Sequence, residues 1–126
     1  RMNLGDVTKK VVPKMCLIAP PQGDGHLSTR TFIPHVCHAA IGVLGAVSAA
    51  TAAIWPGSVA DGISKVPPGR HKTMSVEHPS GEFSVSLEVD ESDGTPNILS
   101  AGLLRTARLL SRGETYVPAS VWSGSD

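Results

Sequence analysis

The chain has 126 residues, 11 basic and 11 acidic side chains, and a hydrophobic content of 40%. This length suits one domain with a moderate core. The basic residues are scattered along the chain, so we expect neither a nucleic-acid surface nor a polybasic membrane patch. Two cysteines argue against a disulfide framework. The N-terminus lacks the apolar core of a signal peptide, and a cytoplasmic location is therefore expected.

The first segment with strand character is residues 7–19, VTKKVVPKMCLIA. Pro13 lies inside it and indicates an edge position or a bulge, because proline cannot donate a ladder hydrogen bond. Alternation places Lys14 and Cys16 on one face of this strand. Both are interpreted as structural residues.

A second strand is predicted over residues 27–33, after a turn with the sequence PPQGDG. Alternation puts Ser28, Arg30 and Phe32 on one side of it. Pro34 ends the strand, so the chain must turn before the next element.

Residues 39–54 form an apolar run with no charge and only two hydroxyl side chains. We predict a helix that begins near Cys37 or His38 and ends around the sequence WPG at residues 55–57. Because apolar residues fill every face, such a helix either spans a membrane or is buried on all sides by protein. The run is short for a span and lacks flanking Lys or Arg anchors, so a core helix is predicted. Its many Ala and Gly residues let neighbouring backbones approach closely.

The second half of the chain predicts a β-hairpin. Residues 73–77 alternate, residues 82–90 alternate most regularly, and the sequence HPSG between them supplies turn chemistry. Four apolar side chains of the second strand share a face: Phe83, Val85, Leu87 and Val89.

The remaining segments are less regular. Residues 58–69 predict a surface connection with a short helical turn at 59–63, and residues 101–117 favour a helix by propensity. Residues 118–126 predict a loose tail. The elements together predict an α+β domain, with a mixed or antiparallel sheet wrapped around a central apolar helix.

Polar side chains gather where the helix is expected to begin, namely His35, Cys37 and His38. A helix start has unpaired backbone N–H groups and the positive end of the helix dipole. The sequence therefore predicts an anion site at this point. A metal site is not predicted, because four ligands at workable spacing are absent.

Four stretches of the chain closely resemble the C-terminal part of the 2-methylaconitate cis–trans isomerase (PrpF-type) family. They are VTKKVVPKMCLIAPP, STRTFIPHVCHAAIGVLGAVSAATA, VEHPSGEFSVSLEVD and AGLLRTARLLSRGETYVPASVW. The resemblance implies the diaminopimelate-epimerase-like fold, in which each of two similar domains wraps strands around a central helix. It also implies that residues 101–117 end in a strand, against local propensity.

The resemblance covers only the second of the two domains found in this family. The active site of such enzymes lies between the domains, and their first domain supplies a lysine and a cysteine proposed for proton transfer. The chain is therefore expected to hold half of a complete site and to need no cofactor.

The implied reaction moves a proton between allylic carbons of an unsaturated tricarboxylate. It requires a base, an acid and groups that hold carboxylates. Cys37 is the candidate catalytic residue, with a small hydrophobe that merely packs as the alternative. The candidate substrate-binding residues are Ser28, Arg30, His35, His38, Ala39, Ala40 and Ser80.

Each of these candidates has a structural alternative. Arg30 suits a bidentate carboxylate clamp or an ion pair with Glu77 or Glu82. The two histidines suit substrate contacts or capping of a helix start. The serines suit anion binding, or simply an exposed strand position for Ser28 and a turn position for Ser80.

The leading hypothesis is an isomerase-family domain for small unsaturated di- or tricarboxylates such as 2-methylaconitate. The alternative is a non-catalytic remnant that self-associates or binds a carboxylate without turnover. The expected partners are a small carboxylate and either a second copy of the chain or a missing N-terminal half, with no nucleic acid and no membrane.

Overall fold

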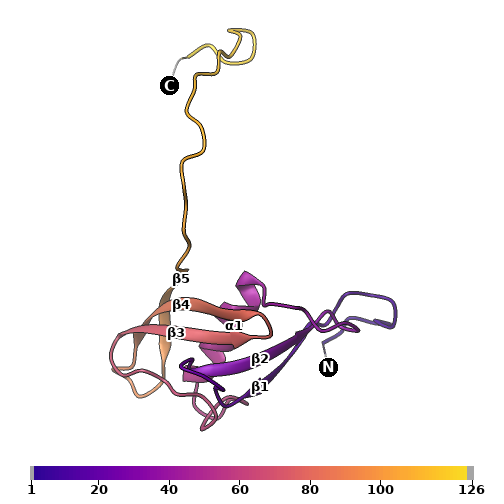
Figure 1. Ribbon diagram of the computed structural model, residues 1–126, viewed down its shortest axis with the longest axis vertical. Coiled ribbons are helices and arrows are strands. Elements are labelled where there is room, and N and C mark those ends of the chain that lie inside the picture. The colour runs from indigo at the N-terminus through magenta and orange to yellow at the C-terminus, as the bar shows by residue number, and fades with distance from the viewer. Residues whose placement is uncertain (1, 125–126) are drawn as a thin grey trace.

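Five strands and one helix make up the part of the chain that the computed structural model describes, residues 2–124 (Figure 1). In chain order the elements are β1 (Met15–Ala19), β2 (Leu27–Phe32), α1 (Val43–Ile54), β3 (His71–His78), β4 (Gly81–Asp90) and β5 (Asn97–Leu103). The predicted α+β class is confirmed.

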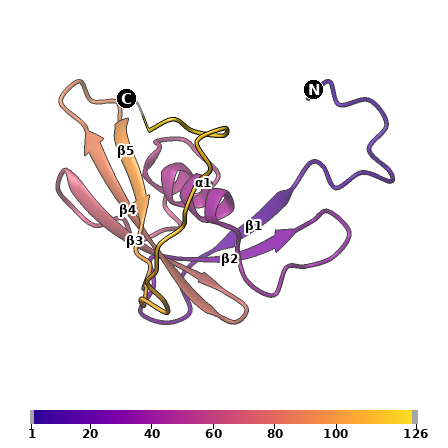
Figure 2. The same cartoon turned by 90° about the horizontal axis from the view of Figure 1, so that it is seen from above.

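The five strands form one mixed sheet in the order β1-β2-β3-β4-β5. Its only parallel pair joins β2 to β3, where the chain crosses over through α1, and the other neighbours are antiparallel. The predicted hairpin is confirmed, with His78 of β3 opposite Gly81 of β4. Figure 2 shows the sheet curving so that α1 lies on its concave side, between the β1–β2 and β4–β5 ends.

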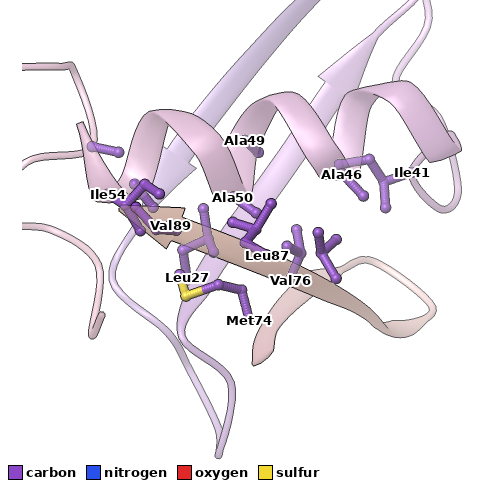
Figure 3. Close-up of a cluster of buried hydrophobic side chains, with 13 residues drawn as sticks. Leu27, Ile41, Ala46, Ala49, Ala50, Ile54, Met74, Val76, Leu87 and Val89 are labelled. Carbon is purple, nitrogen blue, oxygen red and sulfur yellow. The ribbon is translucent and has the colours of Figure 1, made fainter. Parts of the chain in front are cut away.

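The core lies between this concave face and one side of α1 (Figure 3). Alternate residues of the strands supply its large side chains, as the sequence pattern predicts. Alanines supply the helix side, so the backbone of α1 can approach the sheet closely. The fully buried members include Leu27, Met74, Val76, Val85, Leu87 and Val89 from the sheet, with Ala46 and Ala50 from the helix.

The prediction that the helix is buried on every side is wrong. Leu44 is 80% exposed and Val43 is 48% exposed, whereas Ala46, Ala49 and Ala50 are buried. The reason is geometric, because the five strands reach around only one side of α1. Among residues 2–124 no helix is both long enough and apolar enough to cross a membrane.

The predicted helix start near Cys37 or His38 is also wrong, since α1 begins at Val43 with Gly42 as its N-cap. The residues after β2 pair with the sheet instead. Cys37 forms a β-bridge with Phe32, and the His38 N–H donates to the Thr31 carbonyl at 2.7 Å. A backbone N–H that is hydrogen-bonded to the sheet cannot also form an intrahelical hydrogen bond.

Residues 101–117 form neither the helix that propensity favours nor the segment ending in a strand that the resemblance implies. The strand β5 ends at Leu103, and residues 104–118 continue as an exposed extended segment that leaves the sheet (Figure 1). Helix propensity is insufficient here because a short helix needs a surface to pack against. Residues 118–124 of the predicted tail are exposed, and residues 125–126 lie outside the described part.

Two smaller differences concern the ends of elements. The strand predicted over residues 7–19 is confined to β1, after a cis peptide bond between Val12 and Pro13. The helical turn predicted at residues 59–63 is a series of hydrogen-bonded turns, with the Asp61 N–H donating to the Ser58 carbonyl at 3.1 Å.

Candidate functional site

A cavity of about 660 Å³ lies between α1 and the β1–β2 end of the sheet. Its walls are mainly apolar, and α1 supplies one side of it. The polar side chains on its lining are Lys14, Cys16, Thr31, His38 and Ser48. A few polar groups in an apolar concave surface are typical of small-molecule sites.

Three of these side chains come from neighbouring backbone segments. Cys16 of β1 is directly opposite Thr31 of β2, and the two side chains meet with 3.5 Å between the Thr31 Oγ1 and the Cys16 Sγ. His38 lies on the other side of Thr31, because its N–H is bonded to the Thr31 carbonyl. Directly paired residues share a face of a sheet. The three therefore form a row across the cavity, and Lys14 lies two positions before Cys16 on the same face.

The imidazole of His38 is held in one orientation. Its Nδ1 accepts a hydrogen bond of 2.9 Å from the backbone N–H of Ala40. Because that nitrogen is an acceptor, the proton of the neutral ring lies on Nε2. His38 therefore has an N–H donor available for a ligand in the cavity.

The first turn of α1 also borders the cavity, through Val43, Leu44 and Gly45. The first intrahelical bond joins the Ala46 N–H to the Gly42 carbonyl, so these three N–H groups precede the helical ladder. Gly42 makes no side-chain cap. The N-terminal end of the helix dipole thus adds positive potential beside Lys14 and His38.

Cys37 and His35 do not lie at the helix tip where the sequence analysis placed them. Cys37 pairs with Phe32 and immediately precedes His38, so its side chain points to the opposite face of the sheet from the cavity. Its thiol lies 3.7 Å from the His38 carbonyl oxygen. His35 is exposed in the tight turn closed by the Ile33 N–H and the Val36 carbonyl at 3.0 Å.

Ser80 connects the β3–β4 turn to the segment before α1. Its hydroxyl donates to the Ala39 carbonyl at 2.7 Å, and its Oγ lies 3.3 Å from the His78 Nδ1. The Ala40 N–H is already bonded to His38. These bonds bring Ser80, Ala39, Ala40 and His38 together. The Ser80 hydroxyl and the Ala40 N–H are bonded within the chain and are therefore not free to bind a ligand.

Ser28 and Arg30 lie away from the cavity lining. Ser28 is buried between the neighbouring strands, opposite Ala19 and Glu77. Arg30 donates from Nη1 to the Thr29 carbonyl at 2.7 Å. The ion pair considered for Arg30 with Glu77 or Glu82 is not formed. The Glu77 carboxylate accepts three backbone N–H groups of the β1–β2 loop, and the Glu82 carboxylate accepts the Ser75 hydroxyl.

The main residues that sequence reasoning missed as site candidates are Lys14, Cys16 and Thr31. Alternation did place Lys14 and Cys16 on one face of a strand, which was the available signal. That signal does not tell which face the helix will cover. For metal chemistry, residues 2–124 contain no group of three or more His, Cys, Asp or Glu side chains placed to share an ion.

Comparison with known proteins places these features in a family. The model of the family described as "PrpF protein" matches residues 3–118. The chain is 58% identical over 116 residues to a (4E)-oxalomesaconate Delta-isomerase of Novosphingobium sp. (strain KA1), which covers 92% of this chain and 32% of that relative. It is 48% identical over 126 residues to a 4-oxalomesaconate tautomerase of Pseudomonas putida, which covers 100% of this chain and 34% of that relative.

The chain thus spans about a third of the length of these relatives. The family match itself extends over nearly all of the chain, from before β1 to the end of the exposed segment after β5. This chain belongs to the PrpF family.

Proposed function

We propose that this chain is the carboxylate-binding part of a PrpF-type isomerase that acts on small unsaturated di- or tricarboxylates. The names of the two relatives favour an oxalomesaconate-like substrate, with 2-methylaconitate or aconitate as related acids. The reaction would move a proton between allylic carbons without a cofactor. A diaminopimelate-epimerase-like fold and a cytoplasmic location complete the proposal.

The observation that carries this proposal is the meeting of Lys14, His38 and the open first turn of α1 at one cavity. A carboxylate there would find an ammonium group, an imidazole N–H and backbone N–H donors. Hydrogen bonds to an ionised acceptor are about twice as strong as neutral ones. The apolar wall of the cavity suits the carbon skeleton of an unsaturated acid.

The proposed site is half of a complete one. This chain lines the cavity with residues from α1, β1, β2 and the segments beside them, and it spans only about a third of the length of its relatives. The other groups would come from the further polypeptide that the longer relatives contain. Cys37 remains a predicted acid–base residue. Its side chain points to the opposite face of the sheet from the cavity, so the substitution of Cys37 tests that prediction directly.

A second candidate function is binding without turnover, combined with self-association. Exposed apolar side chains favour it, among them Leu44 and Val59, each 80% exposed. Such surfaces are often covered by a partner, and a homodimer would be the simplest arrangement.

Calorimetric titration with trans-aconitate tests the proposed binding site. We expect Lys14→Gln to weaken binding by about tenfold, the value of one charge-assisted hydrogen bond. Lys9→Gln is the matched control, because it removes the same charge outside the cavity. Absence of binding at millimolar concentrations, or equal effects of the two substitutions, would refute the proposed site.

Self-association separates the two candidate functions, because a half-site without its further polypeptide is expected to bind the carboxylate without turnover. The chain is assayed alone for isomerisation of oxalomesaconate, together with its Cys37→Ser variant, and turnover that this variant loses would support a catalytic Cys37. Binding without turnover by a chain that stays monomeric in sedimentation fits the proposed function, whereas a concentration-dependent dimer would assign the chain to the second function.

A further inference from the structure

The two cysteines of this chain occupy different environments although both are exposed. Cys16 faces the cavity, where its sulfur meets the Thr31 hydroxyl at 3.5 Å. Cys37 points to the opposite face and pairs with Phe32. One chain thus contains a thiol inside the proposed anion site and a second thiol outside it.

The charge beside Cys16 distinguishes the two sites further. Lys14 lines the same cavity and lies two residues earlier on the same face, about 7 Å along the strand. Among residues 2–124 it is the one Lys or Arg side chain on the cavity lining, and no acidic side chain of these residues lines the cavity. An anion that enters the cavity is therefore attracted to the wall that holds the thiol.

We propose that Cys16 is a covalent modification site for small anionic electrophiles, in particular carboxylates whose carbon–carbon double bond is conjugated to the carboxyl group. The inference rests on the proposed function, since the same cavity must attract the carboxylate. It goes further by assigning the nucleophile and the product. The thiol lies two residues after Lys14 and opposite Thr31, in the cavity that the first turn of α1 borders.

The reaction needs no other reactant. The Cys16 sulfur forms a bond to the alkene carbon further from the carboxyl, and the π bond of the alkene breaks. Its electron pair moves to the carbon next to the carboxyl, and that carbon takes up the proton that the thiol has lost. The product is a saturated thioether, and the addition is redox-neutral overall, so it needs no oxidant or reductant.

The size of the charge effect can be measured with two reagents that differ in charge and have a similar size. Iodoacetate is an anion and iodoacetamide is neutral, and both alkylate thiols. The rate of each reagent is followed at both cysteines of the same molecules by peptide mass spectrometry. The iodoacetate-to-iodoacetamide rate ratio at Cys16 is then divided by the same ratio at Cys37. This removes the difference in intrinsic reactivity between the two reagents.

We expect this ratio to be about threefold higher at Cys16 than at Cys37, as one unit charge about 7 Å away predicts in water. Lys14→Gln should lower the Cys16 ratio to the Cys37 value, while Lys9→Gln should leave it unchanged. Incubation with trans-aconitate should then give more adduct on Cys16 than on Cys37. Equal ratios at the two cysteines, or no effect of Lys14→Gln, would overturn the proposal.

The Cys16→Ser variant separates this inference from the proposed function. If the wild-type chain forms no adduct but Cys16→Ser still binds trans-aconitate in a titration, the covalent inference fails and the proposed function stands. If the wild-type chain forms no adduct and neither it nor Cys16→Ser binds trans-aconitate, the proposed function fails and the covalent inference fails with it. An unchanged far-ultraviolet circular dichroism spectrum and thermal midpoint in each variant shows that the fold is intact.

Discussion

Gly25, in the β1–β2 loop, and Glu77 of β3 are in contact. The Gly25 N–H donates to the Glu77 Oε1 at 3.0 Å, and a β-carbon added at Gly25 would lie 2.5 Å from the Glu77 Cγ. The same carboxylate accepts the N–H groups of Gln22 at 2.7 Å and Gly23 at 2.9 Å. One side chain of β3 therefore holds the β1–β2 loop in place.

The first prediction concerns the close approach at Gly25. Gly25→Ala would force the Glu77 side chain away and break its bonds to the loop. We expect a loss of about 1–3 kcal/mol in the free energy of unfolding, the usual cost of overpacking. Gly23→Ala is the control, because its added β-carbon would meet Glu77 at an ordinary 3.4 Å. Urea unfolding measures both, and equal midpoints for the two variants would contradict the close contact.

The second prediction concerns the pH dependence of the Glu77 contacts. The backbone N–H of Gln22, and those of Gly23 and Gly25, lower the pKa of the Glu77 carboxyl below its ordinary 4.5, and Lys65 contributes in the same direction. A group whose pKa is lower in the folded state stabilises the fold above its unfolded pKa. This stabilisation is lost as the pH falls through the folded pKa.

Glu77→Gln should therefore destabilise the chain at pH 7, and the difference from wild type should shrink as the pH is lowered from 5 toward 3. Thermal midpoints across this range measure the effect. Asp93→Asn, at an exposed position in the loop between β4 and β5, shows how much of the change is general acid sensitivity. A wild-type advantage that persists undiminished at pH 3 would contradict the proposed role of the carboxylate.

The third prediction concerns the bond between Ser80 and Ala39. It ties the β3–β4 turn to the segment that leads into α1. Ser80→Ala should cost about 1 kcal/mol of stability, the typical net value of one hydrogen bond. It should also speed hydrogen exchange at the amide of Ala40, whose partner His38 lies in the same segment. Ser86→Ala, at an exposed position on β4, should change neither quantity.

The hairpin and the end of α1 could be predicted because their signals are local. The alternating residues of β4, the HPSG turn and the Pro56–Gly57 pair act within a few positions of the chain. Such patterns hold whatever the rest of the fold does. The buried row of Val85, Leu87 and Val89 follows directly from the two-residue period of a strand.

The start of α1 could not be predicted, because a long-range contact decides it. The residues before Val43 have good apolar helix character, yet the His38 N–H is taken by the Thr31 carbonyl of β2. The position of the candidate site could not be predicted for the same reason. Lys14 and Cys16 line the cavity only because the crossover helix covers their side of the sheet, and the sequence does not show which side that is.

The last prediction distinguishes the two sides of α1. Ala50 is fully buried against the sheet, so Ala50→Leu must displace packed side chains such as Val85 or Leu87. We expect a loss of about 1–3 kcal/mol in the free energy of unfolding. Leu44 is 80% exposed, and Leu44→Gln should change stability by less than about 0.5 kcal/mol. Chemical denaturation of the two variants measures the contrast. A large loss for Leu44→Gln would mean that this side of the helix is covered in solution, either by a second copy of the chain or by the segment after β5.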